Sequence, residues 1–91
     1  MSQEPDWDQL KANAALERLS CDALEIRVAQ GGDAETTLRL ARACVRDNRL
    51  TEALAHYDHA ELLGSDEAHA ERRLVARHVG DFPDSNGIHS A

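Results

Sequence analysis

Residues that end or begin helices divide this chain into five short segments. Gly31, Gly64 and Gly80 each follow a helix-like pattern, and further turn residues lie at 20–22 and 47–51. Glycine readily adopts the left-handed conformation that closes a helix, and Ser, Thr and Asp are good N-caps. The expected helices therefore cover 6–19, 22–30, 34–47, 51–63 and 66–79. Because connections this short favour antiparallel neighbours, we expect a series of helical hairpins.

The composition favours helices over sheets. The chain has 91 residues, 42% of them hydrophobic, with only one Trp, one Tyr and one Phe. Its core must therefore consist of Leu, Ala and Val, which suit closely packed helices, whereas sheets favour aromatic and β-branched residues. A chain this short forms one small domain. We expect an all-α domain over residues 6–80, between flexible segments at 1–5 and 81–91.

Small residues on the expected helix 51–63 indicate tight helix packing. Ala53, Tyr57 and Ala60 recur at spacings of four and three, which places them on one face. The two alanines allow neighbouring backbones to approach closely, and Tyr57 is expected to fill the space between the helices of its hairpin. Cys21 and Cys44 also lie in helical patterns, and we expect both to be buried, reduced thiols.

The stretch 34–65 resembles a tetratricopeptide repeat. Leu40 and Ala41 occupy the Leu and small-residue places of the first helix, Cys44 takes the usual Tyr place, and the second helix matches at Ala53, Tyr57 and Ala60. A second, degenerate repeat is suggested over 6–30, where Trp7 and Leu10 resemble the opening pair. The usual Gly between the helices is replaced by Asn48, and the closing Pro is missing at Ser65. The resemblance implies a short solenoid of about five helices that binds other proteins.

The net charge of the chain disfavours nucleic acid and membranes as partners. The net charge of −7 disfavours nonspecific binding to nucleic acid or to anionic membranes, both of which require basic surfaces. No apolar stretch approaches the roughly 20 residues needed for a membrane span. The first ten residues are acidic, unlike a signal peptide, so we expect a cytoplasmic protein.

Few residues have a spacing typical of a metal-binding or catalytic site. Glu52, His56 and His59 have the spacing of metal ligands on a helix, but His59 points away from the apolar face, which favours a solvated surface. His78 lies on an apolar side, where a histidine is more often structural than catalytic. We find no nucleophile setting and no phosphate loop. The expectation is a protein that is not an enzyme and has no cofactor or bound metal.

Arginines are the better candidates for a binding site. Four of them lie between 34 and 49 at helical spacing, whereas 50–71 contains six acids and no Lys or Arg. The tetratricopeptide resemblance would direct Arg42, Arg46 and Arg72 into a concave groove. Guanidinium groups bind carboxylates through paired hydrogen bonds, so the expected ligand is an acidic peptide, a helix or a C-terminal carboxylate. The candidate partner-binding residues are Arg39, Arg42, Arg46, Arg49 and Arg72.

Two functional hypotheses follow. The first is an interaction module, acting as an adaptor, a small chaperone or a regulator, that holds a segment of a partner protein. The alternative is a metal-binding or catalytic accessory protein that uses the His and Glu residues of helix 51–63. The arginines could also form a solvated face paired with the acidic fourth helix. Because the core is small, a homodimer is a further possibility.

Overall fold

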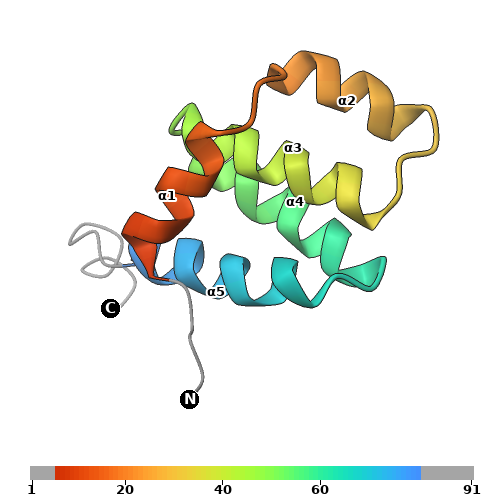
Figure 1. The fold of residues 1–91 in the computed structure, drawn as a ribbon. Helices are drawn as coiled ribbons and strands as arrows, with labels where there is room; N and C mark the ends of the chain where they lie inside the picture. The colour runs from red at the N-terminus through yellow and green to blue at the C-terminus, as the bar shows by residue number, and fades with distance from the viewer. Residues whose placement is uncertain (1–5, 81–91) are drawn as a thin grey trace, which may run out of the picture.

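All regular structure in the part of the chain that the structure describes is helical. The computed structural model describes residues 6–80, and the expected segments at 1–5 and 81–91 lie outside them. This confirms the all-α class. The helices are α1 (Trp7–Ala15), α2 (Cys21–Ala29), α3 (Ala34–Arg46), α4 (Leu50–Leu62) and α5 (Asp66–Gly80) (Figure 1). The largest difference from the expected bounds is in α1, which ends at Ala15 instead of Leu19.

Side chains cap the starts of most helices. Asp6, Ser20 and Asp33 each accept a hydrogen bond from the backbone N–H three residues later, which satisfies a donor that has no partner within its helix. Ser65 does the same at the start of α5. α4 differs from the prediction, because it begins at Leu50 without a side-chain cap and Thr51 lies inside its first turn.

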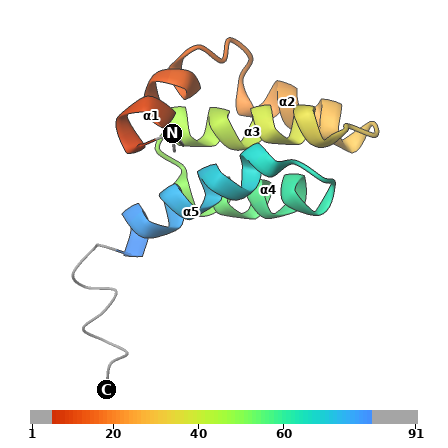
Figure 2. The same cartoon turned by 60° about the horizontal axis from the view of Figure 1, so that its bottom comes forward.

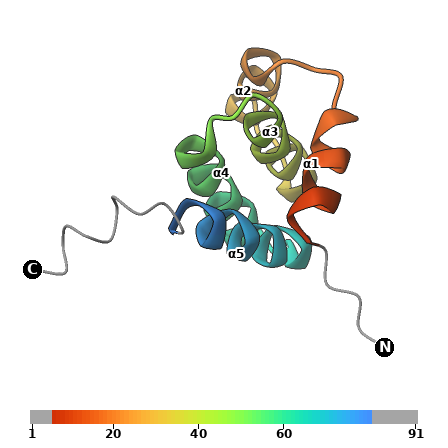
Figure 3. The same cartoon turned by 90° about the vertical axis from the view of Figure 1, so that its left-hand side faces the viewer.

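The α3 helix occupies the centre of the domain. It packs against α1, α2 and α4 (Figure 2). α5 packs against α4 and touches α1. The chain runs back and forth through α3, α4 and α5, so the expected series of hairpins is found in this part of the chain (Figure 1). Figure 3 shows α1 and α2 beside α3 at the edge of the domain.

The first two helices depart from the expected arrangement. α1 and α2 make little or no contact with each other, and each packs on α3 instead. The reason lies in the residues between them, because Arg46 of α3 binds that connection directly. Its Nη1 donates to the carbonyl oxygens of Glu17 at 2.5 Å and Leu19 at 3.0 Å. These bonds hold the connection against α3 and separate α1 from α2.

The core is built from small and aliphatic side chains. Ala53, Tyr57 and Ala60 of α4 are all fully buried, as predicted from their spacing. The two cysteines are also buried and are free thiols, with their Sγ atoms 3.9 Å apart. α3 buries residues around most of its circumference, since it has neighbours on several sides: Thr37, Leu38, Leu40, Ala41, Ala43, Cys44 and Val45.

Candidate functional site

The five predicted arginines do not form one continuous surface. Arg39, Arg42 and Arg46 lie on α3, Arg49 follows that helix, and Arg72 lies on α5. The hypothesis of a solvated arginine face does not fit Arg42 and Arg46, whose side chains are only 23% exposed. Arg42 contacts Glu71 of α5 and Arg46 contacts the α1–α2 connection, so both side chains face other parts of the chain. Each of the five arginines forms an ion pair within the chain.

Arg39 binds Glu17 through two parallel hydrogen bonds. Its Nε lies 2.8 Å from Oε1 and its Nη2 lies 3.0 Å from Oε2. Paired bonds of this kind are the strongest geometry available to a guanidinium and a carboxylate. Hydrogen bonding to Arg39 holds the pKa of Glu17 below its ordinary value, although partial burial opposes the shift. Glu17 is therefore an anion fixed between α1 and α3.

Arg42 belongs to a buried three-residue network. Its Nε and Nη2 donate to the carboxylate of Glu71 on α5, at 3.0 and 2.5 Å. The hydroxyl of Tyr57 donates to the same carboxylate at 2.8 Å. Burial of Tyr57 raises its pKa, which keeps the phenol protonated and able to donate. The network joins α3, α4 and α5, so Arg42 has a structural role.

The other arginines bind neighbouring acids. Arg46 binds Asp47 beside it in the sequence, and Arg49 pairs with Glu52. Arg72 donates to Glu61 at 2.8 Å, and His69 contacts the same carboxylate. Only Arg49 and Arg72 pair with acids of α4. The hypothesis that the arginines pair with the acidic fourth helix therefore holds for two of the five arginines.

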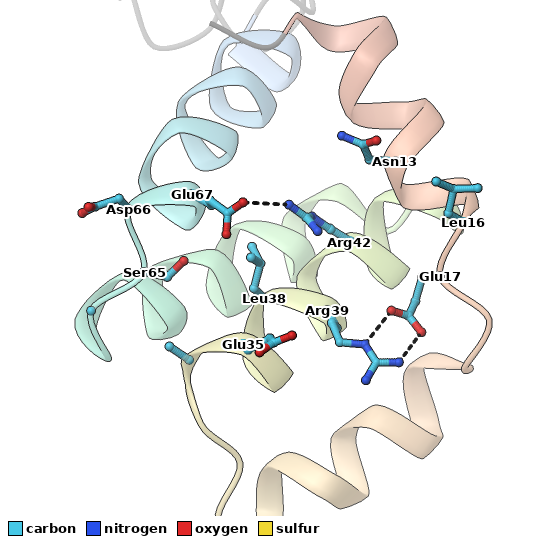
Figure 4. A pocket seen from close by; sticks show the side chains of 12 residues that line it. Asn13, Leu16, Glu17, Glu35, Leu38, Arg39, Arg42, Ser65, Asp66 and Glu67 are labelled. Carbon is cyan, nitrogen blue, oxygen red and sulfur yellow. Dashed lines mark hydrogen bonds and ion pairs between the residues drawn. The ribbon is translucent and has the colours of Figure 1, made fainter. Parts of the chain in front are cut away.

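A groove lies where α1, α3 and the start of α5 meet. It has a volume of about 850 Å³, and its base is the first half of α3 (Figure 4). Figure 4 shows Asn13, Leu16 and Glu17 on one wall and Ser65, Asp66 and Glu67 on the other. Residues from all three helices and the α4–α5 turn line it: Asn13, Leu16, Glu17, Ala34, Glu35, Leu38, Arg39, Arg42, Gly64, Ser65, Asp66 and Glu67. Of the predicted binding residues, only Arg39 and Arg42 reach this groove.

The groove wall carries an exposed leucine, Leu16. The side chain of Leu16 is 75% exposed, because α1 ends one residue before it and the chain turns away. Leu38 lies in the base of the groove, on the side of Glu67, and is buried (Figure 4). An exposed aliphatic side chain beside a concave surface is typical of a site that receives an apolar group from a partner.

The predicted metal ligands are not brought together. Among the residues that the structure describes, no three His, Cys, Asp or Glu side chains are placed to hold a metal ion. Glu52 is paired with Arg49, and His56 is partly buried, which lowers its pKa. His78 stacks on Trp7 with ring centroids 4.2 Å apart and an angle of 12° between the rings, joining α5 to α1.

Two carboxylates in this region were missed by the sequence reasoning. Glu71 left a signal, because it lies between Ala68 and Val75 on the buried face of α5. A charged residue within an apolar stripe is expected to be paired. Glu17 left no such signal, since its partner Arg39 lies 22 residues away. The groove residue Leu16 was also missed, because its exposure depends on the early end of α1.

The fold and groove define a small all-α domain with a candidate binding surface between α1, α3 and α5. Comparison of the chain with protein-family models, with curated proteins and with solved structures finds no match. The tetratricopeptide resemblance therefore stays a prediction from the sequence. Within residues 6–80, no helix is both long enough and apolar enough to cross a membrane.

Proposed function

We propose that this protein is a non-enzymatic interaction module that holds a segment of a partner protein in the groove between α1, α3 and α5. The observation that carries the proposal is Leu16, a largely exposed leucine on the wall of a groove of about 850 Å³. Leaving such a side chain in water gives up roughly 1.5–3 kcal/mol of hydrophobic free energy that a partner could recover by covering it. An adaptor, a small chaperone and a regulator would all use such a surface in this way.

The tetratricopeptide resemblance supports the same class of function. The hairpins α3/α4 and α4/α5 supply the arrangement that such repeats use, and Asn48 replaces the expected Gly without loss of the turn. Asn48 adopts φ 62°, and the hydrogen bonds Asn48 N–Val45 O and Arg49 N–Cys44 O close α3 in the way a glycine would. We propose the cytoplasm as its compartment, since Cys21 and Cys44 lie close together and are free thiols.

The groove can be tested with a matched pair of exposed leucines. Leu16 lines the groove, whereas Leu62, which is 79% exposed at the end of α4, does not. The two side chains are the same and similarly exposed, so Leu16→Glu and Leu62→Glu make the same chemical change. Both variants should fold, as judged by circular dichroism and thermal unfolding, because neither removes a buried side chain.

The experiment is selection of a displayed random-peptide library on the full chain, followed by binding of the enriched peptides to each variant. We expect Leu16→Glu to weaken binding by at least about tenfold and Leu62→Glu to leave it unchanged, since a carboxylate would replace one apolar contact. Equal binding to all three proteins would place the site elsewhere. Failure to enrich any peptide would overturn the proposal that this groove receives a peptide segment.

Arginine substitutions are a poorer test of the same groove. Replacing Arg42 would leave Glu71 buried without its cation, and loss of a buried partner destabilises a protein. A loss of binding in such a variant could therefore arise from unfolding. The leucine pair avoids this difficulty.

A further inference from the structure

The ion pairs formed by the lining residues determine the charge that the groove presents to a ligand. Two arginines line the groove, and both are already neutralised. Arg39 binds Glu17 through two hydrogen bonds, and Arg42 binds Glu71 in the same way. A ligand carboxylate would have to displace one of these acids, and Glu71 also accepts from the buried Tyr57. The acidic ligand expected from the sequence is therefore disfavoured here.

Three further carboxylates line the groove and remain without a full counter-charge. Glu35 and Asp66 are exposed and form no ion pair among residues 6–80. Glu67 lies 4.0 Å from Arg42, but that guanidinium is bound more closely by Glu71. Glu67 is 74% exposed, so its charge is presented to solvent. The groove thus combines an exposed leucine on one wall with three negative charges on its base and opposite wall (Figure 4).

From this geometry we propose that the groove takes a basic amphipathic segment of a partner protein. An apolar side chain of that segment would cover Leu16, and its Lys or Arg side chains would reach across the groove to Glu35, Asp66 and Glu67. The proposal rests on the function proposed above and adds the chemistry of the partner. Complementary charge at the rim of an interface steers association and selects among partners. The net charge of −7 acts in the same direction.

The test compares two synthetic peptides with the same apolar positions, one carrying Lys and the other Glu at every polar position. Binding of each labelled peptide to the full chain is measured by fluorescence anisotropy at low and at high salt. We expect the Lys peptide to bind more tightly, and its affinity to fall as salt increases, because exposed charges are screened.

A matched pair of variants locates the charges responsible. The groove variant carries Glu35→Gln, Asp66→Asn and Glu67→Gln, and the control carries Asp22→Asn, Glu25→Gln and Asp58→Asn. The control residues are exposed carboxylates outside the groove, so both triple variants have the same net charge. We expect the groove variant to bind the Lys peptide about tenfold more weakly, and the control to lose much less, since the three groove charges each contribute a modest exposed pairing with the peptide.

The results of these tests can overturn this inference separately from the proposed function. Equal loss in both triple variants would show that net charge alone attracts the peptide, and preference for the Glu peptide would reverse the assigned sign; either result overturns this inference. If the Glu peptide binds and Leu16→Glu weakens it, the proposed function stands without the inference. If neither peptide binds and library selection also fails, both proposals fall. Dimerisation detected by sedimentation and abolished by the groove variant would assign the groove to a second copy of the chain, which also overturns the inference.

Discussion

Tyr57 of α4 donates a hydrogen bond to Glu71 of α5 at 2.8 Å, with the tyrosine fully buried. The acceptor is the same carboxylate that binds Arg42 of α3, so one buried anion joins three consecutive helices. Within residues 6–80, every buried side-chain N or O atom has a hydrogen-bond partner. In a core made largely of Ala and Leu, this network supplies directional contacts that fix how the helices sit on each other.

Removal of the buried Glu71 side chain should strongly destabilise the domain. Glu71→Ala leaves the Tyr57 hydroxyl and the Arg42 guanidinium without their acceptor, and we expect a loss of about 3 kcal/mol in the free energy of unfolding. Tyr57→Phe removes one donor and should cost about 1–2 kcal/mol. Urea unfolding followed by circular dichroism measures both values.

The control for this prediction is Glu67→Gln, one helical turn before Glu71. Glu67 is 74% exposed, so its substitution should change the free energy of unfolding by less than about 0.5 kcal/mol. A Glu71→Ala protein as stable as Glu67→Gln would contradict a structural role for the network.

Local patterns predicted most of the helices, whereas the contacts between distant residues could not be predicted. Gly64, Asp33 and Ser65 begin or end helices through bonds to residues only a few positions away, so the sequence around them is sufficient. The path between α1 and α2 depends instead on Arg46, which binds carbonyl groups 27 and 29 residues away. No local spacing encodes such a contact.

The candidate site was predicted only in part for the same reason. The helical spacing of the arginines placed Arg39 and Arg42 on one side of α3 correctly, but it could not show which acids would neutralise them. Glu17 and Glu71 approach from α1 and α5 only when the helices pack. The sign of the charge left in the groove therefore follows from the tertiary structure, and it is opposite to the sign expected from the sequence.

Acidification should weaken the contact between Glu17 and Arg39. Because the folded protein holds the pKa of Glu17 below its ordinary value of 4.5, the stabilisation is complete above pH 4.5 and is lost as the pH falls further. Glu17→Gln should cost about 1–2 kcal/mol near neutral pH and much less in acid, where the native glutamate is protonated too. Denaturant unfolding at several pH values measures the difference.

Other carboxyl groups contribute to acid unfolding in the same direction, since the pKa values of Asp33, Asp47 and Glu61 are also lowered by hydrogen bonds. The prediction is therefore made for the difference between Glu17→Gln and the parent chain. If this difference in the free energy of unfolding does not shrink on acidification, the loss of stability in Glu17→Gln does not arise from the charge of the carboxylate.

Asn48 should tolerate glycine better than any β-branched residue. Its φ of 62° lies in the left-handed region, which costs a side-chain-bearing residue about 1–2 kcal/mol and is most accessible to Gly and Asn. Asn48→Gly should be neutral or raise the free energy of unfolding by up to about 1 kcal/mol, whereas Asn48→Val should lower it by about 1–2 kcal/mol. Thermal unfolding of the two variants compares them directly, and a more stable valine variant would contradict a left-handed turn at this position.

The two cysteines should be unreactive in the folded protein although their Sγ atoms lie 3.9 Å apart. Burial raises the pKa of Cys44 from 9.0 to about 12, which strongly lowers its thiolate fraction, and burial also raises the pKa of Cys21. Because the thiolate is the reacting form, iodoacetamide at mildly alkaline pH should label both residues slowly in native protein and rapidly in denaturant. Mass spectrometry counts the labels, and Cys44→Ala assigns the remaining label to Cys21. Rapid labelling without denaturant would instead require that α2 opens from α3 under native conditions, because α3 is the main helix that covers Cys21.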